Sequence, residues 1–85
     1  MADLKAQFEQ AQKEAKTLSK RPSSEDMLAL YSMYKQGSSG DANGSRPGML
    51  DLVGRAKYDA WTRLKGTPPD EAMTRYIAKV KALLG

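Results

Sequence analysis

Four stretches of helical periodicity constrain the fold of this chain more than any other feature of its sequence. In each stretch apolar side chains recur every three or four residues, which places them along one face of an α-helix. No stretch alternates apolar and polar residues with a period of two, so the sequence predicts no strand. The predicted fold class is all-α, with four amphipathic helices packed around one core.

The first two helices are defined by their apolar faces and by the residues at their ends. Ser23, with Asp26 three residues later, resembles a capping box and predicts the start of the second helix. Pro22 ends the first helix, and Gly37 is predicted to end the second. The first helix carries its apolar face at Leu4, Phe8, Ala11, Ala15 and Leu18.

The last two helices are predicted in the same way. We expect the third helix to begin near Asp51 and to end at Gly66, with Leu50, Val53, Ala56, Ala60, Trp61 and Leu64 on its inner face. For the fourth helix we expect Thr67 as N-cap and Pro68 at the first helical position. Its apolar stripe is formed by Met73, Tyr76, Ile77, Val80, Leu83 and Leu84.

A long linker separates the second and third helices. Residues 37–48 contain four glycines, three serines and a proline, a composition typical of a loop. Fully extended at about 3.3 Å per residue, twelve residues span roughly 40 Å, whereas a 14-residue helix is about 21 Å long. The linker is therefore long enough to return along the second helix and leave the second and third helices parallel.

Composition excludes several classes of function. The 85 residues include neither His nor Cys, so a Ser-His-Asp triad, a thiol nucleophile, a disulfide and a His-based zinc site are all ruled out. The length predicts a single domain, residues 1–85. No apolar run reaches the ~20 residues of a transmembrane helix, and no signal core follows the N-terminus. We therefore expect a cytoplasmic protein without stable membrane insertion.

Two lysines stand out from the pattern, in a chain whose net charge is +4. Lys57 lies four residues after Val53 and four before Trp61, within the apolar stripe of the third helix, and Lys35 lies on the aromatic edge of the second. One interpretation is that their stems cover apolar surface while the ammonium groups reach water. The alternative is an anion pocket, in which ammonium groups and tyrosine hydroxyls donate to phosphate oxygens.

Aromatic and methionine side chains leave two further alternatives open. Tyr31, Tyr34 and Tyr76 fall on or beside inward stripes, where they either pack in the core or form a surface that stacks on a nucleobase. The second helix is apolar over more than one stripe, at Met27, Leu28, Leu30 and Met33. The excess is either core, a partner surface or a groove for an alkyl chain.

Several runs of this sequence together resemble the acyl-CoA-binding protein family. They are Leu30–Gln36, Gly40-Asp41, Arg46–Asp51, Gly54–Trp61, Leu64–Gly66, Glu71–Met73 and Tyr76-Ile77. The resemblance implies an up-down-down-up four-helix bundle that binds medium- to long-chain fatty acyl-CoA thioesters. It implies a monomeric carrier and pool former with acyl-CoA as its ligand, no other cofactor and no catalytic activity.

The resemblance also implies roles for individual residues. Tyr31, Lys35 and Lys57 would hold the ribose 3′-phosphate, and Tyr76 would lie near the adenine. Lys16 and Tyr34 complete the nucleotide site, and Met27 and Leu28 contribute to the acyl groove.

The chain departs from the family at a few of these positions. Val53 stands where the family often has a lysine contact, and Tyr58 stands where a tryptophan is frequent. Gln12 and Ala15 replace the Ala and Val that are common in the first helix, which predicts looser packing against the fourth.

Three competing functions follow from the residues alone. A small basic helical module for nucleic acid would need a contiguous positive stripe, but the basic residues are scattered. A thioesterase or acyltransferase acting on the same ligand would lack a His or Cys to act. An interaction bundle would use the exposed side chains of the second helix to meet a protein partner.

Overall fold

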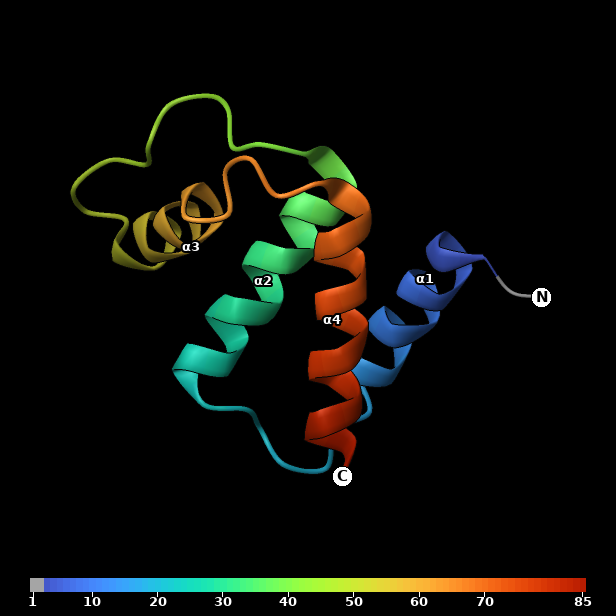
Figure 1. Ribbon diagram of the computed structural model, residues 1–85. Helices are drawn as coiled ribbons and strands as arrows, with labels where there is room; N and C mark the ends of the chain where they lie inside the picture. The colour runs from blue at the N-terminus through green and yellow to red at the C-terminus, as the bar shows by residue number, and fades with distance from the viewer. Residues whose placement is uncertain (1–2) are drawn as a thin grey trace.

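The computed structural model describes residues 3–85, and within them it contains four α-helices and no strand (Figure 1). The helices are α1 (Leu4–Ala15), α2 (Ser24–Ser39), α3 (Leu52–Thr62) and α4 (Pro69–Leu84). The predicted all-α class is therefore confirmed.

Three of the helices begin at a side chain that caps the first turn. Asp3 accepts a hydrogen bond from the Ala6 amide at 2.7 Å, and Ser23 accepts one from the Asp26 amide at 3.1 Å. Asp51 caps α3 through the Gly54 amide at 2.9 Å. Each cap satisfies an amide that would otherwise lack an intrahelical partner. The predicted starts at Ser23 and near Asp51 are confirmed.

The predicted start of α4 is wrong by one residue. Pro68 is the N-cap and makes no capping hydrogen bond with its side chain, while Pro69 is the first helical residue. The reason lies in Thr67, whose amide donates to the Leu64 carbonyl at 2.9 Å. This bond makes Thr67 part of the turn that leaves α3, and Pro69 disfavours helical angles at Pro68, whose ψ is 141°, so the helix begins one residue later.

The predicted helix ends also differ from the structure. The first helix ends at Ala15 rather than running on through Leu18, and α3 ends at Thr62, four residues before Gly66. In both places the chain tightens into turns with bonds between residues three apart, which is common at helix ends. Leu18 and Leu64 remain half-buried although neither is helical.

Gly37 does not end α2, which continues to Ser39 and stops at Gly40, where φ is +80°. Gly37 is buried because the helices approach each other closely there. A Cβ atom on Gly37 would lie 3.0 Å from Met73 Cγ and 3.2 Å from Phe8 Cζ. The glycine therefore serves packing, whereas Gly40 supplies the positive φ that commonly ends a helix.

The core lies between α1, α2 and α4. In Figure 1, α1 and α4 run in the same direction and α2 runs in the opposite one. The buried cluster consists of Phe8, Ala11, Tyr76 and Val80, with Leu30, Met33 and Ile77 packed against it. The Phe8 and Tyr76 rings meet edge to face with centroids 5.2 Å apart, a favourable aromatic geometry.

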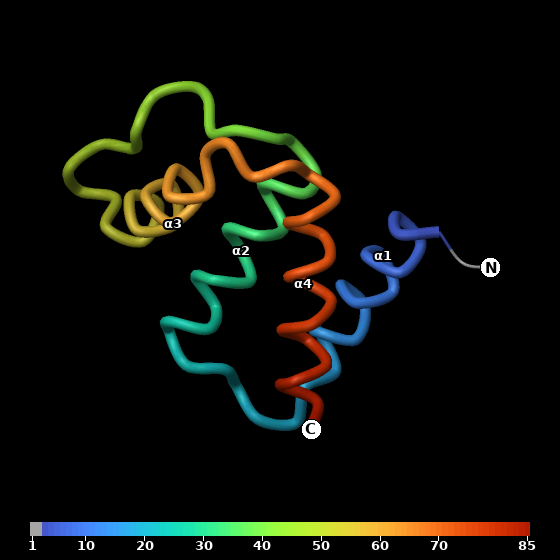
Figure 2. The backbone as a smooth tube through the Cα atoms, viewed as in Figure 1, coloured from blue at the N-terminus to red at the C-terminus, as the bar shows by residue number. Residues whose placement is uncertain are grey.

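The third helix lies outside this core and, among the helices described, packs only on α2. Lys57 approaches the Tyr31 ring and Trp61 approaches Lys35, so the contacts follow the same order along both helices. This order shows that α2 and α3 run in the same sense at their contact. Residues 40–51 connect the end of α2 to the start of α3 as a wide arc (Figure 2).

The predicted inner face of α3 is wrong for three of its six residues, whereas Ala60, Trp61 and Leu64 are buried or half-buried as expected. Trp61 is buried and donates to the Gly40 carbonyl at 2.8 Å. Leu50 and Val53, however, are 100% and 66% exposed, and Ala56 is exposed as well. The physical reason is that α3 has a single neighbouring helix, so most of its apolar face has nothing to pack against.

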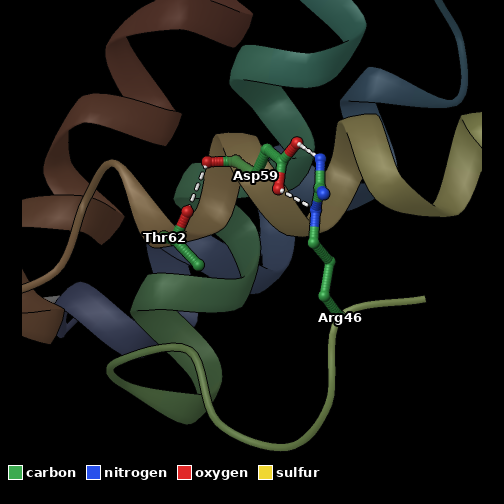
Figure 3. Close-up of polar contacts among 3 residues, drawn as sticks. All are labelled: Arg46, Asp59 and Thr62. Carbon is green, nitrogen blue, oxygen red and sulfur yellow. Dashed lines mark hydrogen bonds and ion pairs between the residues drawn. The ribbon is translucent and has the colours of Figure 1, made fainter. Parts of the chain in front are cut away.

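The long loop is tied to α3 by side chains. Arg46 donates to both carboxylate oxygens of Asp59 at 2.9 and 2.7 Å, in the paired geometry drawn in Figure 3. The hydroxyl of Tyr58 donates to the Gly44 carbonyl at 3.0 Å. The guanidinium of Arg46 lowers the pKa of Asp59 below its usual value of 3.8.

A buried amide ties the start of the same loop to the α3–α4 connection. Gln36 is fully buried, and its Nε2 atom donates to Asp41 at 2.8 Å and to the Thr67 carbonyl at 2.9 Å. Asp41 also accepts from the Gly66 amide at 2.9 Å, and this bond lowers the pKa of Asp41 below 3.8. Two segments distant in sequence, residues 36–41 and 66–67, thus meet at one hydrogen-bonded junction.

Candidate functional site

A cleft of about 350 Å³ opens where α1, α2 and α4 meet, and we call it the tyrosine cleft. Its walls offer phenol hydroxyls, aromatic faces and one ammonium group. Such groups donate to phosphate oxygens and stack on planar rings. The lining residues are Gln12, Ala15, Lys16, Leu30, Tyr31, Tyr34 and Tyr76.

Tyr76 is the most buried of the three tyrosines in this cleft, at 6% exposure. Burial raises the pKa of Tyr76 above its usual value of 10.0, and the neighbouring Tyr34 raises it further. The Tyr76 ring is fixed edge to face against Phe8 in the core. At neutral pH the cleft therefore presents an uncharged phenol on a rigid support.

A second and larger hollow of about 510 Å³ lies between α2 and α3, and we call it the apolar groove. Its walls are mainly aliphatic, with Arg21 and Lys57 as the charged residues among them. An apolar floor with a few polar groups at the edge is typical of a site for a small organic ligand. The lining residues are Arg21, Ser24, Met27, Leu28, Tyr31, Leu52, Val53, Ala56 and Lys57.

Tyr31 belongs to both hollows and therefore connects them. Lys57 Nζ lies 5.3 Å from the centroid of the Tyr31 ring, at the distance of a cation–π contact. One turn further along α2 and α3, Lys35 Nζ lies 4.8 Å from the centroid of the Trp61 ring. The two lysines thus lie on consecutive turns of the contact between α2 and α3.

Most of the predicted site residues gather in these two hollows. Lys16, Tyr31, Tyr34 and Tyr76 line the tyrosine cleft, and Met27, Leu28, Tyr31 and Lys57 line the apolar groove. Lys35 is the exception, because it lines neither hollow and sits over Trp61.

Five lining residues of the apolar groove were not among the predicted site residues: Arg21, Ser24, Leu52, Val53 and Ala56. Periodicity predicted Val53 on the inner face of α3, and only the resemblance to the family placed it at a ligand-contact position. A signal was available, since Val53 lies one turn before Lys57 on the same face. An unpaired lysine in an apolar stripe indicates that the stripe faces an opening.

Two α1 residues that differ from those common in the family also line the tyrosine cleft. Gln12 and Ala15 both line it, and Ala15 packs against the core as well. Their side chains therefore border the tyrosine cleft.

Within residues 3–85, no three acidic side chains are grouped closely enough to hold a metal ion. No helix in the same residues combines the length and the apolar character needed to cross a bilayer.

Comparison with known proteins places this geometry in a family. Residues 5–80 match the profile of the family described as "Acyl CoA binding protein". The acyl-CoA-binding protein of Ricinus communis is 49% identical over 82 residues, which cover 96% of this chain and 91% of that protein. The acyl-CoA-binding protein homolog of Manduca sexta is 46% identical over 82 residues, or 95% of this chain and 91% of that protein.

Solved structures agree with the sequence relatives. The crystal structure of Oryza sativa Acyl-CoA-Binding Protein 2 has a TM-score of 0.91 and 46% identity, over 95% of this chain and 88% of that one. The crystal structure of ACBP from Moniliophthora perniciosa has a TM-score of 0.86 and 36% identity, over 98% of this chain and 80% of that one. The predicted up-down-down-up bundle of this type is confirmed. The chain is a member of the acyl-CoA-binding protein family.

Proposed function

We propose that this protein binds medium- to long-chain fatty acyl-CoA thioesters without reacting with them and acts as an intracellular acyl-CoA carrier and pool former. The observation that supports this most strongly is the pair of hollows that meet at Tyr31. One hollow suits a phosphorylated nucleotide and the other suits an alkyl chain. An acyl-CoA molecule carries both chemistries at its two ends.

The head group is assigned to the tyrosine cleft and the adjoining lysines. Lys57 Nζ lies over the Tyr31 ring where the two hollows join, and together with the Tyr31 hydroxyl it would hold the 3′-phosphate. Lys35, one turn away, reaches this phosphate by leaving the Trp61 ring. Tyr76 and Tyr34 offer faces and hydroxyls to the adenine, and Lys16 supplies a further cation at the rim of the cleft.

The acyl chain is assigned to the apolar groove. Met27 and Leu28 form the α2 side of the groove, and Leu52 and Val53 form the α3 side. At about 0.8 kcal/mol per buried methylene, a 16-carbon chain gains up to roughly 12 kcal/mol before the costs of ordering. Burial of the chain then supplies much of the affinity, while the head group sets the identity of the ligand.

We further propose that residues 1–85 act as one acyl-CoA-binding domain and as a monomer in the cytoplasm, with no catalytic step and no cofactor. The chain has no His or Cys to activate a nucleophile. Its basic residues are scattered along the sequence, which does not favour a nucleic-acid interface.

Calorimetric titration with palmitoyl-CoA, free CoA and CoA lacking the 3′-phosphate tests both halves of the site. We expect palmitoyl-CoA to bind far more tightly than CoA, and the loss of the 3′-phosphate to weaken binding. Equal affinities for palmitoyl-CoA and CoA would show that the groove does not hold the chain.

Two further measurements separate the proposal from its rivals. Incubation with palmitoyl-CoA and a thiol reagent should release no CoA thiol, and steady release would identify a thioesterase instead. Sedimentation equilibrium should give the mass of one chain, with or without ligand, and a dimer would contradict the proposed monomer.

A further inference from the structure

One side chain of the tyrosine cleft carries hydrogen-bonding groups that the fold does not use. Gln12 lines the cleft and is half-buried, and within residues 3–85 its amide has no hydrogen-bond partner. Gln36 differs, because its amide is fully buried and donates to Asp41 and to the Thr67 carbonyl. The Gln12 amide therefore contributes no hydrogen bond to the fold and is available to a ligand.

Gln12 stands at the end of the cleft that lies away from the apolar groove. Tyr31 joins the cleft to that groove, and Lys57 approaches the Tyr31 ring there. Gln12 and Tyr34 instead also line a further hollow of about 380 Å³, which shares no lining residue with the apolar groove. The cleft thus runs from Tyr31 at one end to Tyr34 and Gln12 at the other.

This order determines where the parts of a bound nucleotide lie. The proposed function assigns the 3′-phosphate to Lys57 and Tyr31, at the end of the cleft that meets the apolar groove. The base is joined to the same ribose as this phosphate, so it extends along the cleft toward the opposite end. The end that receives the base is the one that Tyr34 and Gln12 line.

Phe8 gives Gln12 a fixed place beside the aromatic rings of the cleft. The centroid of the Phe8 ring lies 6.2 Å from that of Tyr34 and 5.2 Å from that of Tyr76. Gln12 follows Phe8 by four residues in α1, so the two side chains lie one above the other on the same face of the helix. Because the tyrosines offer rings and hydroxyls to the base, the Gln12 amide is left to meet its edge.

A carboxamide matches the edge of adenine. It holds a donor and an acceptor side by side in one plane, and adenine presents its N6 amino donor beside the N7 acceptor. The other polar side chains among the described residues of the lining are Lys16 and three tyrosines. An ammonium group only donates, and a hydroxyl carries both functions on a single oxygen. Gln12 is therefore the residue of this lining that can pair with adenine through two parallel hydrogen bonds.

We propose that Gln12 reads the base of the bound acyl-CoA. Its amide donates to N7 of adenine and accepts from the N6 amino group, which gives the protein a preference for adenine over bases that carry oxygen at C6. This inference rests on the proposed acyl-CoA binding and adds a residue that determines specificity within that site. Gln12 stands where the family often has alanine, so the contact is a feature of this chain.

Calorimetric titration of the full chain with palmitoyl-CoA and with its hypoxanthine analogue tests the proposal. The analogue carries oxygen in place of the 6-amino group and therefore offers two acceptors at the edge where adenine offers a donor and an acceptor. We expect the wild type to bind the analogue about tenfold more weakly than palmitoyl-CoA, because the paired hydrogen bonds to the base are lost.

Gln12→Met separates hydrogen bonding from packing, because methionine has a similar length and volume but no amide. This variant should bind palmitoyl-CoA about tenfold more weakly than the wild type does. It should also bind palmitoyl-CoA and the hypoxanthine analogue with nearly equal affinity, since it no longer pairs with either base.

The matched control is Gln10→Met, which makes the same change at an exposed position of α1 that does not line the tyrosine cleft. It should keep the wild-type affinities for both ligands. An equal loss of preference in Gln10→Met and Gln12→Met would overturn the proposal, because the effect would then belong to α1 as a whole.

The outcomes separate this inference from the function on which it rests. A wild type that binds palmitoyl-CoA and the analogue equally well would overturn the role of Gln12 while leaving acyl-CoA binding in place. A Gln12→Met protein that keeps the wild-type preference would do the same, and Gln12 would then be only a solvated residue of α1. A wild type that binds neither ligand would overturn the proposed function and this inference together.

Discussion

The helices α1, α2 and α4 differ sharply from α3 and the loop that precedes it. The first three enclose a cluster in which Phe8 is 3% exposed and Val80 is fully buried. The region around α3 buries Trp61 but leaves Leu50 and Leu52 in solvent. Both regions carry amphipathic helices. The difference shows that the apolar face of a helix becomes part of the core only where two other helices pack against it.

The two regions also differ in what holds them together. The three-helix unit is packed through side chains such as the crossed rings of Phe8 and Tyr76. The α3 region is attached to α2 by cation–π contacts and to its loop by the Arg46–Asp59 pair. Packing of the first kind favours stability, whereas exposed apolar surface held by polar contacts favours binding.

The largest expected effect is on stability and concerns the core. Phe8→Ala should lower the free energy of unfolding by about 3–5 kcal/mol, because it leaves a cavity in the cluster. Leu50→Ala, the matched change in the other region, should leave the free energy of unfolding nearly unchanged. Urea denaturation followed by circular dichroism measures both. Similar losses in the two variants would abolish the distinction between the regions.

The next largest effect is on the binding of palmitoyl-CoA, and the free energy of unfolding should not change. Lys57→Ala and Lys35→Ala should each weaken palmitoyl-CoA binding by about 1 kcal/mol or more, on the scale of a hydrogen bond to a charged group. The ligand without its 3′-phosphate should hardly distinguish either variant from the wild type. Calorimetry on these proteins and on Lys13→Ala, an exposed lysine of α1 that lines neither hollow, provides the comparison. Normal binding by both variants would place the phosphate elsewhere.

Low pH should weaken the hydrogen bonds and ion pairs that aspartate side chains make in both regions. The pKa values of Asp26, Asp41 and Asp59 are lowered below 3.8, chiefly by hydrogen bonds from Lys79, the Gly66 amide and Arg46 respectively. Their contribution is therefore complete above the unfolded value and is lost as pH falls through the lower folded values.

Urea denaturation at a series of pH values tests this expectation. The free energy of unfolding should decline below about pH 4, and Asp41→Asn should reduce the slope of that decline. An Asp41→Asn protein with the wild-type slope would show that the junction with Gln36 and Gly66 does not depend on the charge.

The smallest effect on global stability is expected from the loop contact. Arg46→Ala removes an exposed ion pair, and such pairs contribute little to the free energy of unfolding. The loop of residues 40–51 should nevertheless be cut faster by a nonspecific protease, because the pair fastens it to α3. Arg75→Ala, which breaks an ion pair within α4, should not change the cleavage rate. Equal rates for the wild type and Arg46→Ala would show that Tyr58 and the Asp51 cap suffice.

Local features of the fold were predictable from the sequence because neighbouring residues create them. Ser23 caps the second helix through an amide three residues along, so its role depends on no distant contact. The same holds for Asp51 and for the periodic stripes of α1 and α4. We could predict that Tyr31 and Lys57 lie together, because their positions on the two helices and the resemblance to a known family both indicated it.

Contacts between distant segments decided the rest. Gly37 is buried inside α2 where Phe8 and Met73 approach it, and Thr67 belongs to the turn that leaves α3, one residue before the N-cap of α4. Periodicity showed which face of α3 is apolar, but only the tertiary arrangement left Leu52 and Val53 uncovered. The physical reason is that side-chain spacing defines a face within one segment, whereas burial depends on which other segments come to lie against that face.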